Sequence, residues 1–169
     1  ALNVADMDRH VYEDFCLTIA RHPSETDERM MLRIVAFALH ADPQLAFGKG
    51  ISTEDEPDLW QRSLDGETER WIDLGMPNER RIRKACGKAA EVVLYCYGGN
   101  SVSIWWGKQA AALQRFGNLS VYAIDPEASQ ALAAFAAANM TLQCTVQDGE
   151  ASVSTNQGDQ VLVAPVRLN

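Results

Sequence analysis

The residues of this chain best suited to chemistry are two aspartates that flank a predicted hairpin. Asp65-Gly66 supplies the positive φ angles that a two-residue hairpin loop requires. With that loop, Trp60 lies opposite Trp71, and an aromatic cross-strand pair supports the register. The same register sets Asp58 against Asp73, which is destabilising unless something positive lies between the two carboxylates. A bound cation would explain the pair.

The hairpin pattern also allows a different register. A loop longer than two residues would slip the pairing and leave both aspartates in water at the ends of the strands. A slip of one residue would also turn each side chain to the other face of the sheet. The sequence leaves both registers open.

A third carboxylate, Glu28, lies on a helix that is predicted to begin at the N-cap Ser24 and to end near Leu39. Glu28 comes three residues before Met31 and therefore shares the apolar face of this helix. A carboxylate on that face needs a partner, such as a metal ion, an arginine or water. The alternative is that Glu28 only complements the helix dipole, which is the interpretation we give to Glu25.

A basic segment follows the hairpin on a second predicted helix, residues 79–90. Five of the fifteen Lys and Arg residues fall within nine positions, namely Arg80, Arg81, Arg83, Lys84 and Lys88. This segment could bind nucleic-acid phosphates, or it could be the solvated face of a helix. The formal net charge of −8 weighs against nonspecific binding of nucleic acid by the chain as a whole.

Two or three carboxylates at the end of a sheet form a site of hard oxygen ligands that suits Mg²⁺ or Mn²⁺. Such an ion lowers the pKa of a bound water and neutralises charge on a phosphoryl oxygen, while a nearby ammonium group steadies the attacking water. Phosphodiester hydrolysis is therefore the reaction that these residue types could serve.

Length and composition favour one globular domain, residues 1–169. A chain of this length with 47% hydrophobic residues can bury a core of useful size. No apolar run approaches the roughly 18 residues of a membrane span and no leader opens the chain, so we predict a cytoplasmic protein without membrane association. The cysteines form no C-x-x-C pair, which argues against zinc and a disulfide framework and predicts four buried thiols: Cys16, Cys86, Cys96 and Cys144.

The remaining elements are predicted to complete the sheet around the acid pair. Strands are predicted at 1–8, 11–20, 92–97 and 119–124, further helices at 105–115 and 126–139, and a connection at 41–56. The helix between 92–97 and 119–124 predicts a crossover and a parallel strand pair. Residues 141–147, 151–154 and 161–166 are predicted to form an antiparallel meander.

Several runs of this sequence resemble known proteins. Pro57-Asp58 lies fifteen positions before Asp73-x-Gly75, after a helix that carries Glu28, and this order resembles the PD-(D/E)XK nuclease motif. Longer and more specific runs cover nearly the whole chain. They include Ala20–Thr26, Glu28–Arg33, Asp55–Pro57, Glu79–Ile82, Lys84–Cys86, Ile104–Trp106, Asn118–Val121 and Met140–Gln143. Through these runs the chain resembles the YaeQ family, whose members are largely uncharacterised in function.

The resemblance implies an α/β fold built on a variant PD-(D/E)XK nuclease-like core, with a mixed central sheet flanked by helices and an added antiparallel meander. It implies Asp58 and Asp73 as metal-binding acids, and Glu28 as the acid of the first helix. Gly75 stands where the nuclease motif has lysine. Lys84 on the next helix is the candidate for that amine, with Arg81 and Lys88 as the next candidates.

Two functions from different classes follow. The first is a Mg²⁺- or Mn²⁺-dependent nuclease or related phosphodiesterase, with Asp58, Asp73 and Lys84 as catalytic residues and Asp58, Asp73 and Glu28 around the metal. The second is a noncatalytic nuclease-like module that binds nucleic acid or protein. Nucleic acid would bind through the basic side chains of Arg80, Arg81, Lys84 and Lys88. The opposed acids favour the first function, while the missing lysine and the acidic charge favour the second.

Overall fold

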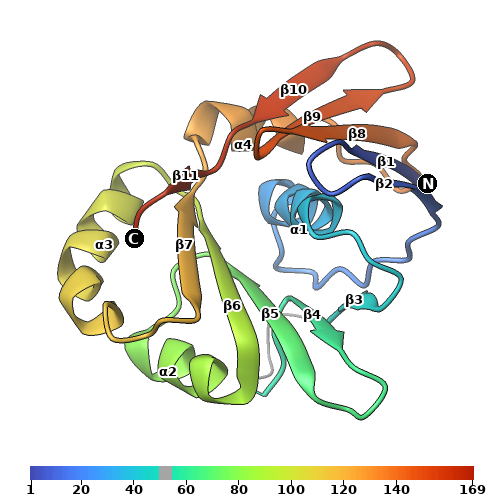
Figure 1. The fold of residues 1–169 in the computed structure, drawn as a ribbon. Coiled ribbons are helices and arrows are strands. Elements are labelled where there is room, and N and C mark those ends of the chain that lie inside the picture. The colour runs from blue at the N-terminus through green and yellow to red at the C-terminus, as the bar shows by residue number, and fades with distance from the viewer. Residues whose placement is uncertain (50–54) are drawn as a thin grey trace.

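Two mixed β-sheets form the framework of the molecule (Figure 1). The computed structural model describes residues 1–49 and 55–169. In these residues one sheet has the strand order β10-β9-β8-β1-β2, and the other has the order β11-β7-β6-β5-β4-β3. Helix α1 (Asp27–Leu39) lies between the sheets, where it contacts β8 and β9 of the first and β5 of the second. Helix α4 (Pro126–Ala133) packs beside α1.

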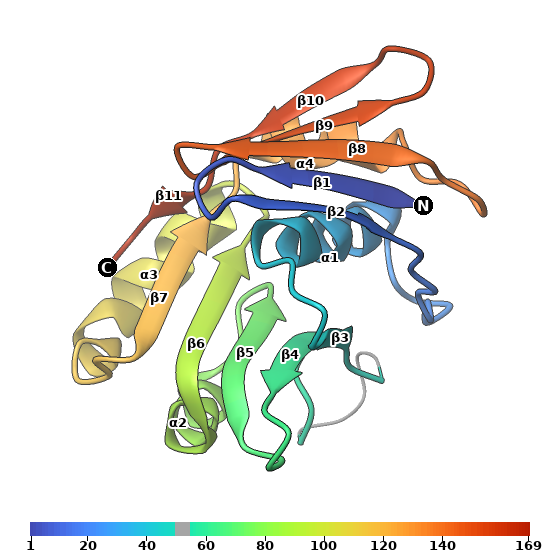
Figure 2. The same ribbon diagram turned by 45° about the vertical axis from the view of Figure 1, so that its right-hand side comes forward.

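The first sheet combines the N-terminal hairpin with three strands from the C-terminal part of the chain (Figure 2). The strand β1 pairs in parallel with β8, and all other neighbours in this sheet are antiparallel. The predicted meander is therefore confirmed, but it extends the N-terminal hairpin into a second sheet instead of lengthening the central one. The strands are β1 (Leu2–Asp6), β2 (Val11–Phe15), β8 (Leu142–Gln147), β9 (Glu150–Thr155) and β10 (Gln160–Val163).

The second sheet carries the predicted acid pair. Its central strands β5, β6 and β7 run parallel, which confirms the predicted crossover between β6 and β7, and β3, β4 and β11 are antiparallel to their neighbours. Helices α2 (Glu79–Lys88) and α3 (Asn100–Leu113) contribute to the apolar cluster on one face, while α1 packs on the other. The strands are β3 (Leu45–Phe47), β4 (Leu59–Arg62), β5 (Thr68–Leu74), β6 (Ala89–Cys96), β7 (Leu119–Ala123) and β11 (Val166–Arg167).

The β4–β5 hairpin has the predicted register with a different loop. Trp60 pairs with Trp71, and their rings meet edge to face with centroids 6.4 Å apart. The loop has three residues rather than two, and it is closed by a hydrogen bond from the Gly66 amide to the Ser63 carbonyl oxygen (3.0 Å). A bulge at Glu69 on β5 offsets the extra loop residue, so the register beside the acids is the predicted one.

Helix α1 begins later than predicted. Its N-cap is Thr26, whose hydroxyl accepts a hydrogen bond from the Arg29 amide (3.1 Å). The predicted cap, Ser24, instead places its hydroxyl 2.6 Å from Nδ1 of His22. Glu25 therefore precedes the helix, and its side chain is free to turn inward.

Other element boundaries also differ from the predictions. Strand β2 ends at Phe15, α3 begins directly after Gly99, and α4 ends at Ala133. The four cysteines are free thiols. The prediction that they are buried is confirmed for Cys96 and Cys144, but Cys86 is only half-buried and Cys16 is exposed. The predicted connection at 41–56 includes the short strand β3, and part of it, 50–54, lies outside the described residues.

Candidate functional site

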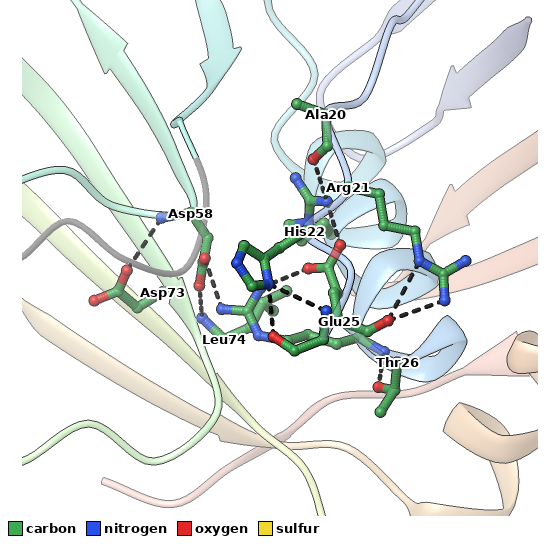
Figure 3. Close-up of polar contacts among 11 residues, drawn as sticks. Ala20, Arg21, His22, Glu25, Thr26, Asp58, Asp73 and Leu74 are labelled. Atoms are coloured by element: carbon green, nitrogen blue, oxygen red, sulfur yellow. Dashed lines mark hydrogen bonds and ion pairs between the residues drawn. The ribbon is translucent and has the colours of Figure 1, made fainter.

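The two predicted aspartates lie side by side in the second sheet, at the carboxyl end of β5. Asp58 immediately precedes β4, and Asp73 lies near the end of β5, so antiparallel pairing brings both to the carboxyl end of β5. The Asp58 amide donates to Oδ1 of Asp73 at 3.2 Å (Figure 3). Their side chains are 8% and 4% exposed, so both carboxylates are buried and need partners.

Arg29 of α1 neutralises Asp58. Its Nη2 lies 2.7 Å from Oδ1 of Asp58, while the Leu74 amide donates to Oδ2 at 2.8 Å. Burial raises the pKa of Asp58, and Arg29 opposes this effect without cancelling it. Burial lowers the pKa of Arg29, but the neighbouring Asp58 and Glu25 carboxylates outweigh this effect and raise the pKa above its usual value. Arg29 therefore stays charged beside Asp58.

Arg81 of α2 neutralises Asp73 from the other side. Its Nε lies 2.8 Å from Oδ2 and its Nη2 lies 3.2 Å from Oδ1, so the guanidinium engages both oxygens. The Trp71 indole N–H also donates to Oδ2 at 3.1 Å. Nη2 of Arg81 reaches the Glu56 carbonyl oxygen at 2.9 Å as well, which ties α2 to the segment before β4.

Glu25 belongs to the same network, although we interpreted it as a helix-capping acid. Its carboxylate lies 2.8 Å from Nη1 of Arg29 and 2.5 Å from Nη2 of Arg33 (Figure 3). The side chains of Glu25 and Arg33 are 1% and 3% exposed. The spacing could have revealed this cluster, because residues four apart share a helix face and the two arginines lie four and eight positions after Glu25.

Glu28 and Lys84 are placed elsewhere in the structure. Glu28 accepts a hydrogen bond from the Ser129 hydroxyl at 3.1 Å and so links α1 to α4. The Lys84 ammonium is 3.3 Å from Asp55, and its side chain is 45% exposed. Lys88 approaches the same carboxylate at 3.8 Å. Among the described contacts, the basic residue of α2 that reaches the acid pair is Arg81.

Gly48, which follows β3, contacts the backbone of Asp58. Its amide donates to the Asp58 carbonyl oxygen at 2.9 Å just beyond β3. A Cβ atom at this position would lie 1.9 Å from the Pro57 carbonyl oxygen, far inside contact distance. The absence of a side chain at Gly48 therefore allows the backbone to approach Asp58.

The donor set around the acids does not fit a divalent metal in this arrangement. All four carboxylate oxygens of Asp58 and Asp73 accept hydrogen bonds from N–H groups. No group of three or more His, Cys, Asp or Glu side chains within 1–49 and 55–169 is arranged to hold a metal ion. The positive charge that the opposed acids require is supplied by two guanidinium groups.

The two-sheet fold and the site around Asp58 and Asp73 define a mixed α/β protein with a buried acid pair neutralised by arginines. The chain belongs to the YaeQ family, because the family model described as "YaeQ protein" matches residues 1–164. None of the helices in the described part of the chain is both long and apolar enough to cross a membrane.

Relatives and solved structures agree with this assignment. The chain is 49% identical to "Uncharacterized protein YaeQ" of Escherichia coli K12 over 148 residues, which cover 88% of this chain and 82% of that protein. The Salmonella typhi protein of the same name is 48% identical over the same shares. The crystal structure of YaeQ from Xanthomonas axonopodis pv. citri matches with a TM-score of 0.94 and 46% identity, over 98% of this chain and 93% of that one. The Pseudomonas syringae YaeQ structure matches with a TM-score of 0.90 and 36% identity, over 99% and 92%.

Proposed function

We propose that this chain is a noncatalytic nuclease-like module that binds nucleic acid. The observation that carries the proposal is the occupation of all four oxygens of Asp58 and Asp73 by N–H donors. A metal-dependent nuclease needs these oxygens as ligands for Mg²⁺ or Mn²⁺. A single domain spanning residues 1–169 and a cytoplasmic location belong to the same proposal.

The proposed core is a variant of the PD-(D/E)XK nuclease arrangement. Support comes from the order of elements: α1 precedes the β4–β5 hairpin, the hairpin carries both acids, and α2 follows directly. The position of the motif lysine is taken by Gly75, which has a φ of 96° and no side chain to offer. The basic group beside the acids is a guanidinium from α2, and a group that remains charged is poorly suited to accept a proton from water.

The proposed nucleic-acid interface is the exposed basic face of α2. Arg80, Arg83, Lys84 and Lys88 are all exposed on this helix. The two lysines pair with Asp55, whose side chain is 78% exposed, and such solvated pairs contribute little stability. A phosphate group could therefore replace Asp55. Arg81, which we predicted as part of this face, is instead committed to Asp73.

Fluorescence anisotropy with labelled single- and double-stranded DNA and RNA tests the proposal. The parent is compared with Arg80→Gln/Arg83→Gln on α2, and with the exposed Lys108→Gln on α3 as the matched control. We expect the α2 variant to weaken binding and to reduce the salt slope for duplex DNA by about two, because two phosphate contacts are lost. Lys108→Gln should bind like the parent.

Three results would contradict the proposal. Equal binding by the parent and the α2 variant would exclude the α2 face as the interface. Absence of binding by the parent would leave a protein partner as the remaining binding function. Cleavage of any of these substrates in Mg²⁺ or Mn²⁺, lost in Asp73→Asn, would show that the chain is the metal-dependent nuclease after all.

A further inference from the structure

An exposed guanidinium group lies over an indole ring on the second sheet. Trp60 of β4 is half-buried, and the guanidinium carbon of Arg62 lies 4.1 Å from the centroid of the Trp60 ring. The ring of Trp71, a residue that is only 3% exposed, meets the Trp60 ring edge to face at an angle of 87°. Trp60 is therefore a fixed support beneath an exposed cation, and we call the two side chains the Arg62–Trp60 stack.

Arg62 is available to a ligand. It is exposed at the end of β4, and it forms no salt bridge within the described ranges 1–49 and 55–169. Trp60 covers one face of the guanidinium group, so the opposite face is turned toward solvent. A guanidinium group is planar and weakly hydrated, and flat rings stack on it. The solvent face of Arg62 is therefore a surface on which a flat ring can stack.

The Arg62–Trp60 stack lies close to the end of the basic helix α2. Arg62 pairs with Thr68 on β5, and Thr68 pairs with Ala89 on β6, directly after Lys88. Adjacent strands are about 4.8 Å apart, so two strand spacings, about 10 Å, separate the backbone of Arg62 from the end of α2. Figure 2 shows the tip of the hairpin and this end of α2 at the same end of the sheet.

The stack and α2 also lie on the same face of the sheet. Trp71 packs in the apolar cluster that contains the buried side chains of α2, and Trp60 contacts Trp71. On α2, the ammonium groups of Lys84 and Lys88 approach Asp55, which lies shortly before β4. The stack and the two lysines therefore border one strip of surface between α2 and the hairpin.

We propose that an unpaired nucleobase stacks on the solvent face of Arg62, and that this stack and α2 together bind single-stranded nucleic acid. The inference rests on the proposed function, because the phosphates of the same strand would contact the lysines of α2. A base in a duplex is covered on both faces by its neighbours, whereas an unpaired base has a face to offer. Stacking reads no base edge, so DNA and RNA of any sequence can occupy this position.

Fluorescence anisotropy with a labelled oligothymidylate, a labelled oligouridylate and a DNA duplex of the same length tests the inference. The parent is compared with Arg62→Lys, which keeps the charge but has no planar group to stack. The matched control is Arg167→Lys. Arg167 is also exposed and lies over an aromatic ring, that of Tyr122, but it belongs to β11 at the far edge of the sheet.

The expected loss is confined to single strands. Arg62→Lys should bind both single-stranded probes roughly five- to a hundredfold more weakly than the parent, because the stacking of one base is lost. Its duplex affinity and its salt slopes should equal those of the parent, because the charge is kept. Arg167→Lys should bind all three probes like the parent, and thermal unfolding verifies that both variants are folded.

Three results would overturn the inference while the proposed function stands. The first is parent-like binding of single strands by Arg62→Lys. The second is an equal loss for the duplex, because Arg62 would then act on phosphates and not on an unpaired base. The third is the same loss in Arg167→Lys, which would show that the effect is not particular to the stack. If the parent binds none of the three probes, the inference and the nucleic-acid-binding function both fail.

Discussion

His40 gives the fold a pH dependence that can be worked out from its surroundings. It caps the end of α1, and its Nε2 lies 2.6 Å from the hydroxyl of Tyr95 on β6. Burial, together with the positive charges of Arg70 and Arg9, lowers the pKa of His40 to about 3. The imidazole is therefore neutral in the folded protein throughout the range in which an unfolded histidine takes up a proton.

The sign of the effect follows from proton binding. Below about pH 6.5 the unfolded chain binds a proton at His40 that the folded chain does not, so acid favours unfolding. Stability attributable to this group is present above the unfolded pKa, is lost as the pH falls through 6.5, and continues to fall toward the folded pKa of about 3. Between pH 7 and pH 5 the free energy of unfolding should drop by about 2 kcal/mol from His40 alone.

Urea unfolding at pH 7, 6 and 5 measures this slope. The test compares the parent with His40→Gln, which keeps a polar group near Tyr95 but cannot titrate. His10→Asn is the matched control, because His10 is exposed and has a φ of 59°, which asparagine tolerates. We expect His40→Gln to be less stable at pH 7 and to lose about 2 kcal/mol less than the parent on going to pH 5.

The reasoning is refuted if His40→Gln keeps the full pH slope of the parent. That result would mean that the folded protein protonates His40 as readily as the unfolded chain does. Loss of the slope in His10→Asn instead would assign the effect to the exposed histidine.

Two further predictions concern the support of the acid pair, both read from urea unfolding. Gly48→Ala should cost about 1–3 kcal/mol because its Cβ would meet the Pro57 carbonyl, whereas Gly87→Ala, with open space on α2, should gain up to about 1 kcal/mol. Equal effects would contradict the close approach. Glu25→Gln should cost about 3–5 kcal/mol because it leaves buried cations unpaired, while Asp27→Asn, whose side chain is 51% exposed, should cost under about 1 kcal/mol. A small loss for Glu25→Gln would remove it from the network.

The register of the hairpin could be predicted from the sequence although its loop could not. Cross-strand pairing of Trp60 with Trp71 is a packing preference that residue types reveal. The loop that begins after Ser63 carries Asp65-Gly66, a dipeptide that serves two-residue and longer loops alike. The bulge at Glu69 cannot be recognised from the residue types, because it arises from how the paired strands twist. The extra loop residue and the bulge therefore offset each other in the register, and Asp58 still lies beside Asp73.

The choice between Arg81 and Lys84 as the partner of the acids could have been made from the helical period. The buried side chains of α2 are Ile82 and Ala85, with Cys86 packed against the same cluster. At about 100° per residue, Arg81 lies about 70–90° from the centre of this stripe, while Lys84 lies about 130–150° from it. A long side chain near the border of a buried stripe can reach inward, whereas one nearly opposite it points to water.

The same reasoning shows how two arginines can meet the requirement from which a metal was first predicted. Opposed carboxylates require a positive charge, and residue spacing can locate them, as it did for Asp58 and Asp73. The chemical identity of that charge depends on which basic side chains the flanking helices direct toward the pair. Both helices that pack beside this edge supply an arginine, Arg29 from α1 and Arg81 from α2. The positive charge that the opposed aspartates require is therefore supplied by the chain itself. Binding of Mn²⁺ at Asp58 and Asp73 in the parent protein would be direct evidence against this explanation.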